Sequence, residues 1–338
     1  MITIYHIIPN LNSAGAENFL LSLSKHLSKD YNQIIYTFSS PQKDTLFPKF
    51  DSSIKFLFGK KELIESLKKF QNPIIMCWMY PSILFLEKLR FFNKIEAKII
   101  WNIRHSSFLT FQLKQKVGLL FLGLLSRIRK YYILYCAYSS RDYHQRFFFY
   151  KRKSKVILNG LTKQLDLKYL KNEDFFLYVG RYNTSKGPDL LLRAFKKYVK
   201  LHPQAKLKIA GDGWRRNQID NSLNNNIEIL GNVDDLSTLY SKAECFLFTS
   251  KTEGFPNVLA EACSFGLPII ATIAGDARVI LKDYPNSKIA TTERHFFELL
   301  NNFEKNDFTH RSKTAKDFRK RFNFDSTVSN YIKFFESL

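Results

Sequence analysis

Two glutamates bracket a short segment in the second half of the chain. Glu253 and Glu261 begin and end the string Glu-Gly-Phe-Pro-Asn-Val-Leu-Ala-Glu, which lies between two apolar runs. β-rich runs on both sides of a helical segment predict a βαβ unit with parallel strands, and Pro256 and Asn257 suit the start of its helix. The free amides there, helped by the helix dipole, can bind an anion. Carboxylates on both sides of an anion site indicate a ligand that carries phosphates and hydroxyls.

The same string resembles the paired-glutamate motif of the retaining glycosyltransferase family four, a group 1 glycosyl transferase family that includes bacterial surface-polysaccharide enzymes. The resemblance implies an α/β protein of the GT-B fold, in which two Rossmann-like domains face each other across a cleft. It also implies that Glu253 contacts the donor sugar, that Glu261 binds the ribose hydroxyls and that the helix start holds the diphosphate. Donor-binding roles follow for Phe255, Pro256, Asn257, Val258 and Leu259.

A second constellation supplies positive charge. A predicted strand ends at Gly180, and Arg181 and Lys186 follow it five residues apart. A diphosphate leaving group gathers negative charge as the glycosidic bond breaks, so cations at this place lower the barrier. The loop resembles the Gly-Arg…Lys-Gly element of the family, which assigns both side chains to the diphosphate and to catalysis. We find no Asp-x-Asp motif and no His/Cys cluster with ligand spacing, so we expect no metal and no other cofactor.

The loop after the first predicted strand opens a helix with an apolar face. Ala14 and Gly15 are small enough to let a ligand approach the backbone amides. The family has Gly-Gly-Ala-Glu here, so Ala14 is a departure from its pattern. The resemblance assigns Gly15 to the donor and Ala14 to the acceptor.

Another predicted strand ends near Arg104 and His105. In the family, a histidine at this strand end contacts the transferred sugar, which implies a catalytic role for His105 at the cleft. Arg104 is a candidate ligand for an acceptor phosphate. Family resemblance further places Gly211 against the nucleotide.

Two more segments bear on the donor. The resemblance places Ile229 and Leu230 against the base of the nucleotide. In the segment Thr-Ile-Ala-Gly-Asp at 272–276, Ile273 and Asp276 depart from the family pattern. These two departures put a donor contact there in doubt.

Charge is distributed unevenly along the chain. The formal net charge is +22, and residues 1–165 carry 26 Lys and Arg against 9 Asp and Glu, whereas residues 166–338 carry 26 against 21. A basic first half indicates a polyanionic surface partner. Nucleic acid is disfavoured because no helix-turn-helix, zinc-finger or RNA-recognition signature accompanies the charge. Anionic lipid is the alternative that we favour.

One segment of the basic half suits a headgroup layer. Residues 117–125 form an uninterrupted apolar run with basic residues at both ends, too short to span a bilayer. A buried core helix with solvated ends is an equally good interpretation of this run. The aromatic and basic string at 147–153 resembles interfacial segments, and together the two segments favour contact with a membrane.

The chain shows no N-terminal signal peptide, since residues 1–8 read as a strand without a basic region before them. Its four cysteines are far apart in apolar surroundings, which is typical of buried thiols in a reducing compartment. We therefore expect a cytoplasmic protein that is peripheral on the inner face of the plasma membrane. The four are Cys77, Cys136, Cys245 and Cys263.

Strand and helix patterns alternate twice along the chain. In the first half we predict strands at 2–8, 32–38, 54–58, 73–79, 97–103, 132–137 and 155–158, and helices at 15–28, 61–70, 81–92, 113–130 and 140–148. In the second half we predict strands at 175–180, 206–210, 227–230, 245–249 and 268–272, and helices near 187–201, 214–224, 234–242 and 257–265. An amphipathic helical segment covers about 308–338.

These patterns predict an acceptor-binding domain at 1–160 and a nucleotide-sugar-binding domain at 161–321. By resemblance, a last helix at about 322–338 crosses back onto the first domain.

The combined expectation is a retaining, metal-independent glycosyltransferase that uses a nucleotide diphosphate sugar, in particular a UDP-sugar. Its acceptor would be a lipid-linked saccharide of lipopolysaccharide, capsule or related glycan synthesis. Two alternatives remain open: a nucleotide-sugar epimerase of GT-B fold, and a non-catalytic subunit that binds a sugar nucleotide. An epimerase would convert its substrate without an acceptor, whereas a transferase would leave most of the donor intact.

Overall fold

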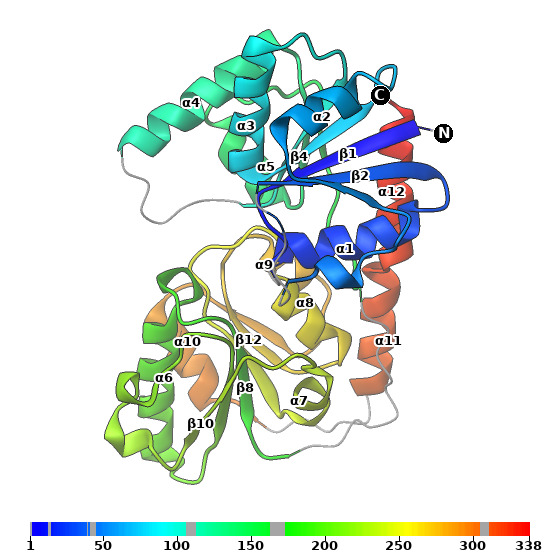
Figure 1. The fold of residues 1–338 in the computed structure, drawn as a ribbon. Coiled ribbons are helices and arrows are strands. Elements are labelled where there is room, and N and C mark those ends of the chain that lie inside the picture. Colours follow the sequence, from blue (N-terminus) through cyan, green and yellow to red (C-terminus); the bar gives the residue numbers. More distant parts are fainter. Residues whose placement is uncertain are drawn as a thin grey trace. The chain divides into compact units, whose positions relative to one another are not determined.

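The computed structural model describes residues 2–12, 15–38, 40, 45–105, 113–162, 173–304 and 311–338 (Figure 1). The chain divides into two compact units. The first contains the described residues up to Thr162 together with Phe324–Leu338, and the second contains those between Lys163 and Asn323. The last helix of the chain therefore belongs to the same unit as the first strand.

The described residues of the first unit form a seven-stranded parallel sheet. The strands are β1 (Ile2–Ile8), β2 (Tyr31–Thr37), β3 (Lys55–Leu57), β4 (Ile74–Trp78), β5 (Lys98–Ile103), β6 (Tyr132–Tyr135) and β7 (Ser154–Val156). They lie in the order β3-β2-β1-β4-β5-β6-β7. Because helices cover both faces, strands such as β1 and β4 are apolar almost throughout rather than alternating.

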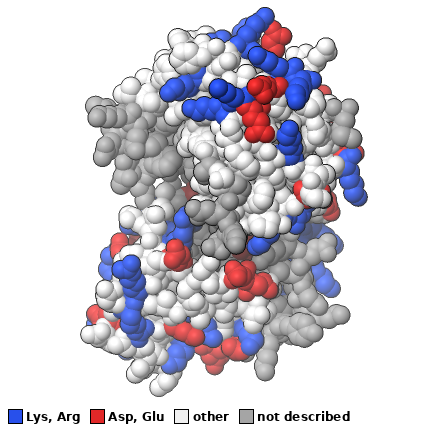
Figure 2. All heavy atoms as spheres, in the orientation of Figure 1, with Lys and Arg blue, Asp and Glu red and all other residues white. Residues whose placement is uncertain are grey.

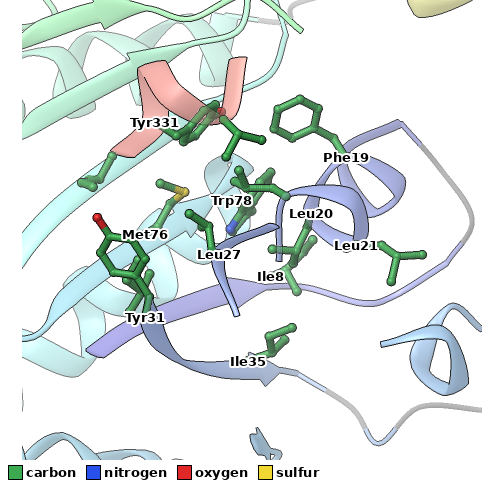
Figure 3. Packing of buried hydrophobic residues seen from close by; sticks show 14 of the residues in the cluster. Ile8, Phe19, Leu20, Leu21, Leu27, Tyr31, Ile35, Met76, Trp78 and Tyr331 are labelled. Atoms are coloured by element: carbon green, nitrogen blue, oxygen red, sulfur yellow. The ribbon is translucent and has the colours of Figure 1, made fainter. Parts of the chain in front are cut away.

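Helices cover the two faces of this sheet. They are α1 (Gly15–Leu27), α2 (Lys60–Leu67), α3 (Met79–Phe92), α4 (Leu113–Ile128), α5 (Tyr138–Gln145) and α12 (Phe324–Glu336), with a 3-10 turn at Phe47–Lys49. On one face α1 and α12 pack together, and Figure 3 shows Tyr331 of α12 beside Phe19 of α1 and Trp78 at the end of β4. The other face is covered by α2 to α5.

The described residues of the second unit form a six-stranded parallel sheet in the order β10-β9-β8-β11-β12-β13. The strands are β8 (Phe176–Val179), β9 (Leu207–Ala210), β10 (Ile227–Gly231), β11 (Cys245–Phe248), β12 (Ile269–Thr272) and β13 (Ser287–Ala290). The strand order reverses between β8 and β11. Open α/β sheets bind ligands outside the carboxyl ends of the strands at such a point.

The helices of the second unit are α6 (Pro188–Leu201), α7 (Ser237–Lys242), α8 (Asn257–Ser264), α9 (Ala277–Ile280), α10 (Glu293–Asn301) and α11 (Arg311–Arg321). Short 3-10 turns lie at Thr184–Lys186, Arg216–Gln218 and Asn221–Leu223. β13, α9 and α10 were not predicted from the sequence. Most of the other elements fall within a few residues of their predicted ranges.

The predicted helix at 214–224 is wrong, because two 3-10 turns take its place. Asp220 accepts hydrogen bonds from the backbone and the hydroxyl of Ser222, at 2.9 Å and 2.6 Å. Gln218 likewise accepts from the amide of Arg215, at 2.7 Å. Such local bonds compete with the helical ladder and break it into turns.

The predicted helical segment at 308–338 is also not one helix. It is interrupted at Phe322 and Asn323, between α11 in the second unit and α12 in the first. α11 is mostly polar, whereas α12 buries Val328, Tyr331 and Phe335. The two helices therefore pack in different cores, and residues 305–310 lie outside the described part.

Three histidines of the described chain titrate far below the ordinary range. Burial lowers the pKa of His6 in β1 and of His144 in α5 to about 4. Burial, and then the charge of Arg104, lowers the pKa of His105 to about 4 as well. These side chains are therefore neutral in the folded protein at pH 7.

We expect stability to fall as the pH drops from about 6.5 toward 4. Over this window the unfolded chain binds up to three more protons than the folded chain, and each extra proton lowers the free energy of unfolding by about 1.4 kcal/mol per pH unit. Urea unfolding at pH 7, 5.5 and 4.5 measures this slope. His6→Gln should reduce it by about one proton, and equal stability at pH 7 and 5 would contradict the buried neutral histidines.

Candidate functional site

Two loops meet where the strand order of the second unit reverses. One follows β8 and carries Arg181 and Lys186, and the other follows β11 and carries Glu253. The carbonyl of Lys186 accepts hydrogen bonds from Tyr178 Oη and Thr249 Oγ1, both at 3.1 Å. Gly187 has φ +66°, and a Cβ there would lie 2.0 Å from the carbonyl oxygen of Thr249. The close approach of the two loops therefore depends on glycine.

An ion pair joins the two loops. Lys186 Nζ lies 2.5 Å from Glu253 Oε1, and Ser250 Oγ donates to the same oxygen at 2.9 Å. The lysine side chain is 25% exposed and the glutamate 14%. Glu253 Oε2 makes no hydrogen bond to the described residues. That oxygen is available to accept a hydroxyl of a ligand.

Arg181 lies on the same loop as Lys186. Its side chain is exposed and makes no hydrogen bond or ion pair within the described part of the chain. A guanidinium in this state can bind a phosphate in bidentate fashion. The neighbouring carbonyl of Gly180 accepts from Trp214 Nε1 at 2.8 Å, and a Cβ on Gly211 would lie 2.3 Å from it. Gly211 is therefore needed for the β8 and β9 loops to touch.

The start of α8 supplies the predicted anion site. Pro256 caps the helix without a side-chain hydrogen bond. The amide of Leu259 donates to the carbonyl of Pro256 at 3.1 Å, so of the three predicted amides this one has an internal partner. The amide of Val258 makes no hydrogen bond to the described backbone, and an unpaired amide in the first turn of a helix can bind an anion.

The side chains around this helix start divide into two kinds. Asn257 and Val258 are half-buried, whereas Phe255 and Pro256 are buried. Phe255 packs on Phe322 with the ring centroids 5.9 Å apart. Phe255 therefore packs within the second unit, and its predicted contact with a donor stays a prediction.

Glu261 lies one turn along α8 and is half-buried. Its Oε2 accepts a hydrogen bond from Tyr240 Oη of α7 at 3.1 Å. Burial, and then the charge of Glu261, raises the pKa of Tyr240 well above its ordinary value, so the hydroxyl stays protonated and donates. The sequence analysis did not identify this tyrosine, because one aromatic residue in a helix is most often a core residue.

The predicted base-binding residues lie at the carboxyl end of β10. Ile229 and Leu230 are half-buried, and the register with β9 shifts between Ile229 and Gly231. Such a bulge redirects a strand end. The end of β10 thereby lies next to Gly211, whose amide donates a hydrogen bond to the carbonyl of Gly231 at 2.7 Å.

A third loop supports Glu253. It follows β12, and its Asp276 amide donates to the carbonyl of Gly254 at 3.0 Å. Gly275 has φ +55°, and a Cβ there would lie 2.3 Å from the carbonyl oxygen of Gly254 and 2.6 Å from that of Glu253. The departures at Ile273 and Asp276 had put a donor contact of this loop in doubt. In the structure this loop packs against the backbone of Glu253 and Gly254, a role that the sequence analysis missed. The feature of the sequence that could have indicated it is Gly275, which follows a predicted strand by a few residues.

In the first unit, Arg104 is already engaged. Its guanidinium donates to Asn159 Oδ1 at 2.7 Å and to Tyr331 Oη at 3.4 Å, and it lies 4.1 Å from the ring centroid of Phe19. These contacts tie α1, α12 and the segment after β7 together. Arg104 thus has a structural role, and its predicted acceptor contact stays a prediction.

His105 follows β5 and is half-buried, and its carbonyl accepts a hydrogen bond from Ser140 Oγ of α5. Because its pKa is about 4, the imidazole is neutral at pH 7 and can donate or accept a hydrogen bond with a sugar hydroxyl. Gly15 begins α1, and Ala14 lies outside the described residues. In the described part of the chain, no group of three His, Cys, Asp or Glu side chains is placed to hold a metal ion.

The Glu253 loop should respond to a methyl group at Gly275. Gly275→Ala and Gly231→Ala both place alanine at positive φ, which costs about 1–2 kcal/mol, but a Cβ on Gly231 meets nothing within 4 Å. Gly275→Ala should therefore lose at least about 1 kcal/mol more, measured by urea unfolding. Equal stability of the two variants would show that the third loop does not support Glu253.

Part of the chain matches a known family model, and that part lies in the second unit. Residues 164–321 match the family model of the glycosyl transferases, group 1. The chain is 33% identical to an uncharacterized glycosyltransferase of Methanocaldococcus jannaschii over 141 residues, which cover 36% of this chain and 34% of that protein. It is 25% identical to an α-1,4-N-acetyl-D-galactosaminyltransferase of Campylobacter jejuni over 312 residues, covering 84% of this chain and 83% of that one. The chain thus spans about a third of the first relative and most of the second.

Solved structures share the fold over the whole chain. Anabaena HepE in complex with UDP matches with a TM-score of 0.79 at 16% identity, covering 100% of both chains. The lipopolysaccharide outer core galactosyltransferase WaaB matches with a TM-score of 0.69 at 18% identity, covering 100% of this chain and 99% of that one. With two Rossmann-like units and these structural matches, the chain has the GT-B fold, and its second unit matches the family model of the glycosyl transferases, group 1.

Proposed function

We propose that this protein is a retaining glycosyltransferase that moves a sugar from a UDP-sugar to a lipid-linked saccharide in the synthesis of lipopolysaccharide, capsule or a related surface glycan. The observation that carries the proposal is the Lys186–Glu253 pair at the point where the strand order reverses. Lys186 lies on the loop that also carries the exposed guanidinium of Arg181, and Glu253 lies on the loop that leads into α8. Cations, amides and an available carboxylate oxygen suit a diphosphate joined to a sugar.

The choice of donor and acceptor is supported by relatives. HepE of Anabaena has been solved with UDP and with UDP-glucose. The Campylobacter jejuni relative is named for an acceptor saccharide on undecaprenyl diphosphate. A capsular polysaccharide glycosyltransferase of Staphylococcus aureus, CapM, is 34% identical over 120 residues. These names support a nucleotide-sugar donor and an acceptor on a lipid carrier.

The mechanism that we propose places positive charge where the bond breaks. Arg181, Lys186 and the start of α8 would balance the charge on the departing diphosphate. A diphosphate oxygen accepts the proton of the acceptor hydroxyl while the new bond forms on the same face of the sugar, which retains the anomeric configuration. Glu253 Oε2 would accept a donor-sugar hydroxyl, Glu261 would hold the ribose hydroxyls, and neutral His105 would hydrogen-bond the transferred sugar. In this scheme the protein's cations take the place of a metal.

One experiment tests the reaction class. The protein is incubated with UDP-glucose, UDP-galactose or their N-acetyl forms, with and without lipid-linked saccharides extracted from bacterial membranes, and in the presence or absence of EDTA. We expect acceptor-dependent transfer that EDTA does not abolish, and an α-linked product by NMR. Conversion of the donor sugar without acceptor would identify an epimerase, and tight UDP binding without any turnover would identify a binding subunit.

Removing either cation should slow turnover without unfolding the protein. Losing one preorganised charge contact to the leaving group costs ~3 kcal/mol, or about a hundredfold in kcat, so Lys186→Gln and Arg181→Gln should each show a loss of that size. Lys251→Gln is the matched control, because this exposed lysine lies in the neighbouring loop and pairs with Asp189 instead. Near wild-type turnover in both site variants would contradict the proposal that Arg181 and Lys186 bind the departing diphosphate.

A further inference from the structure

Helix α4 has two apolar faces, of which one is buried. Leu119 and Leu122 are 3% and 4% exposed and pack in the core of the first unit. The opposite stripe is formed by exposed side chains at helical spacing: Val117 57%, Leu120 38%, Phe121 62%, Leu124 46% and Ile128 76%. One face of residues 117–125 therefore belongs to the core, as one of the two interpretations predicted, and the other face is exposed. Figure 1 shows α4 at the edge of the first unit, beside α3.

The exposed stripe continues onto neighbouring elements. A Cβ on Gly123 would lie 1.7 Å from the carbonyl oxygen of Phe147, so α4 packs directly on the turn after α5. Arg127 Nε donates to the carbonyl of Phe148 at 2.7 Å, and its guanidinium lies 5.5 Å from the Phe148 ring centroid. The Phe148 side chain is 49% exposed. The turn thus adds an aromatic residue to the stripe.

The end of α3 adds two more exposed rings. Phe91 and Phe92 are 84% and 72% exposed. The preceding residue, Arg90, donates a hydrogen bond to the hydroxyl of Tyr131, three residues after the end of α4. This contact brings the ends of the two helices together. A cluster of exposed apolar side chains on this scale marks an interaction site.

The positive charge around the stripe favours an anionic partner. Residues 113–155 contain 11 Lys and Arg and a single acid, Asp142. The exposed cations of the stripe's surroundings include Lys116, Arg129, Lys130, Lys151 and Arg152. Figure 2 shows one side of the first unit, on which blue Lys and Arg side chains lie among white side chains with red Asp and Glu between them. A second copy of this chain would bring the same cations together, whereas an anionic lipid surface would neutralise them.

We propose that the exposed stripe of α4, with Phe148, Phe91 and Phe92, docks on an anionic bilayer. The apolar side chains enter the headgroup layer and the surrounding cations bind lipid phosphates, as an interfacial helix does. No described helix is long and apolar enough to cross a membrane. This surface goes beyond the reaction proposed above and is tested without turnover.

The test uses vesicles of phosphatidylcholine alone and with 30% phosphatidylglycerol, and measures co-sedimentation of the full chain between 50 mM and 500 mM NaCl. We expect binding to the anionic vesicles that weakens with salt but keeps a salt-resistant fraction. Equal binding to both vesicle types, or binding to neither, would overturn the proposal. Dimers in place of vesicle binding would also overturn it, if they dissociate in the Ser variant below, since a second copy would then cover the stripe.

Three variants separate the two contributions. Leu120→Ser/Phe121→Ser/Leu124→Ser changes only exposed side chains and should lose the salt-resistant fraction, with at least about tenfold weaker binding. Lys116→Gln/Lys151→Gln/Arg152→Gln should lose the salt-dependent part. The matched control, Lys200→Gln/Lys313→Gln/Lys316→Gln, removes three exposed cations of the second unit and should bind like the wild type. Wild-type binding by the Ser variant would overturn the proposal.

A tryptophan reporter gives a positive signal. The native tryptophans Trp78, Trp101 and Trp214 are at most 7% exposed, so a new exposed indole dominates quenching by lipids. Phe121→Trp should shift to the blue on binding and be quenched by brominated acyl chains. Leu201→Trp, at an exposed apolar position of the second unit, should show neither effect. Equal quenching of the two reporters would place the contact elsewhere.

Discussion

The candidate site depends on how closely the loops after β8 and β11 approach each other. Gly187 leaves no room for a side chain, and the carbonyl of Lys186 is held by two hydroxyls from neighbouring strand ends. This holds the lysine ammonium 2.5 Å from Glu253. An ammonium that is only partly hydrated and paired on one side needs little rearrangement to meet a second anion, which is the condition for effective charge stabilisation.

The meeting of these loops could be predicted from the sequence, because each loop follows a predicted strand of a parallel sheet. Arg181, Lys186, Glu253 and Glu261 stood out because cations, glycines and a helix start follow neighbouring strands, and their roles toward a donor stay predictions. Their supports were not visible, because Tyr240 and Gly275 act through contacts between elements 21 residues or more apart in sequence. A single aromatic residue or glycine carries no periodicity that would indicate such a contact.

The first unit was harder to interpret for a related reason. Arg104 stood at a strand end and suggested an acceptor ligand, but its hydrogen bonds reach Asn159 and Tyr331, 55 and 227 residues away. The chain returns to this unit at Phe324, and the aromatic face of α12 then completes its core around Tyr331. A polar side chain at a strand end can thus join three distant segments, a structural role that the sequence did not reveal, and the acceptor contact of Arg104 stays a prediction.

Helix α4 shows why a continuous apolar run was ambiguous. A helix with one buried face alternates apolar and polar residues at a period of about 3.6, and that period let us place α1 and α6. When the outward face is apolar as well, the period vanishes, and composition alone cannot separate a core helix from an interfacial one. The exposure of Val117, Phe121 and Ile128 against the burial of Leu119 and Leu122 restores the distinction. A water-facing stripe of large apolar side chains is costly for an exposed surface, and the anionic lipid layer proposed as its partner would remove that cost while neutralising the cations around it.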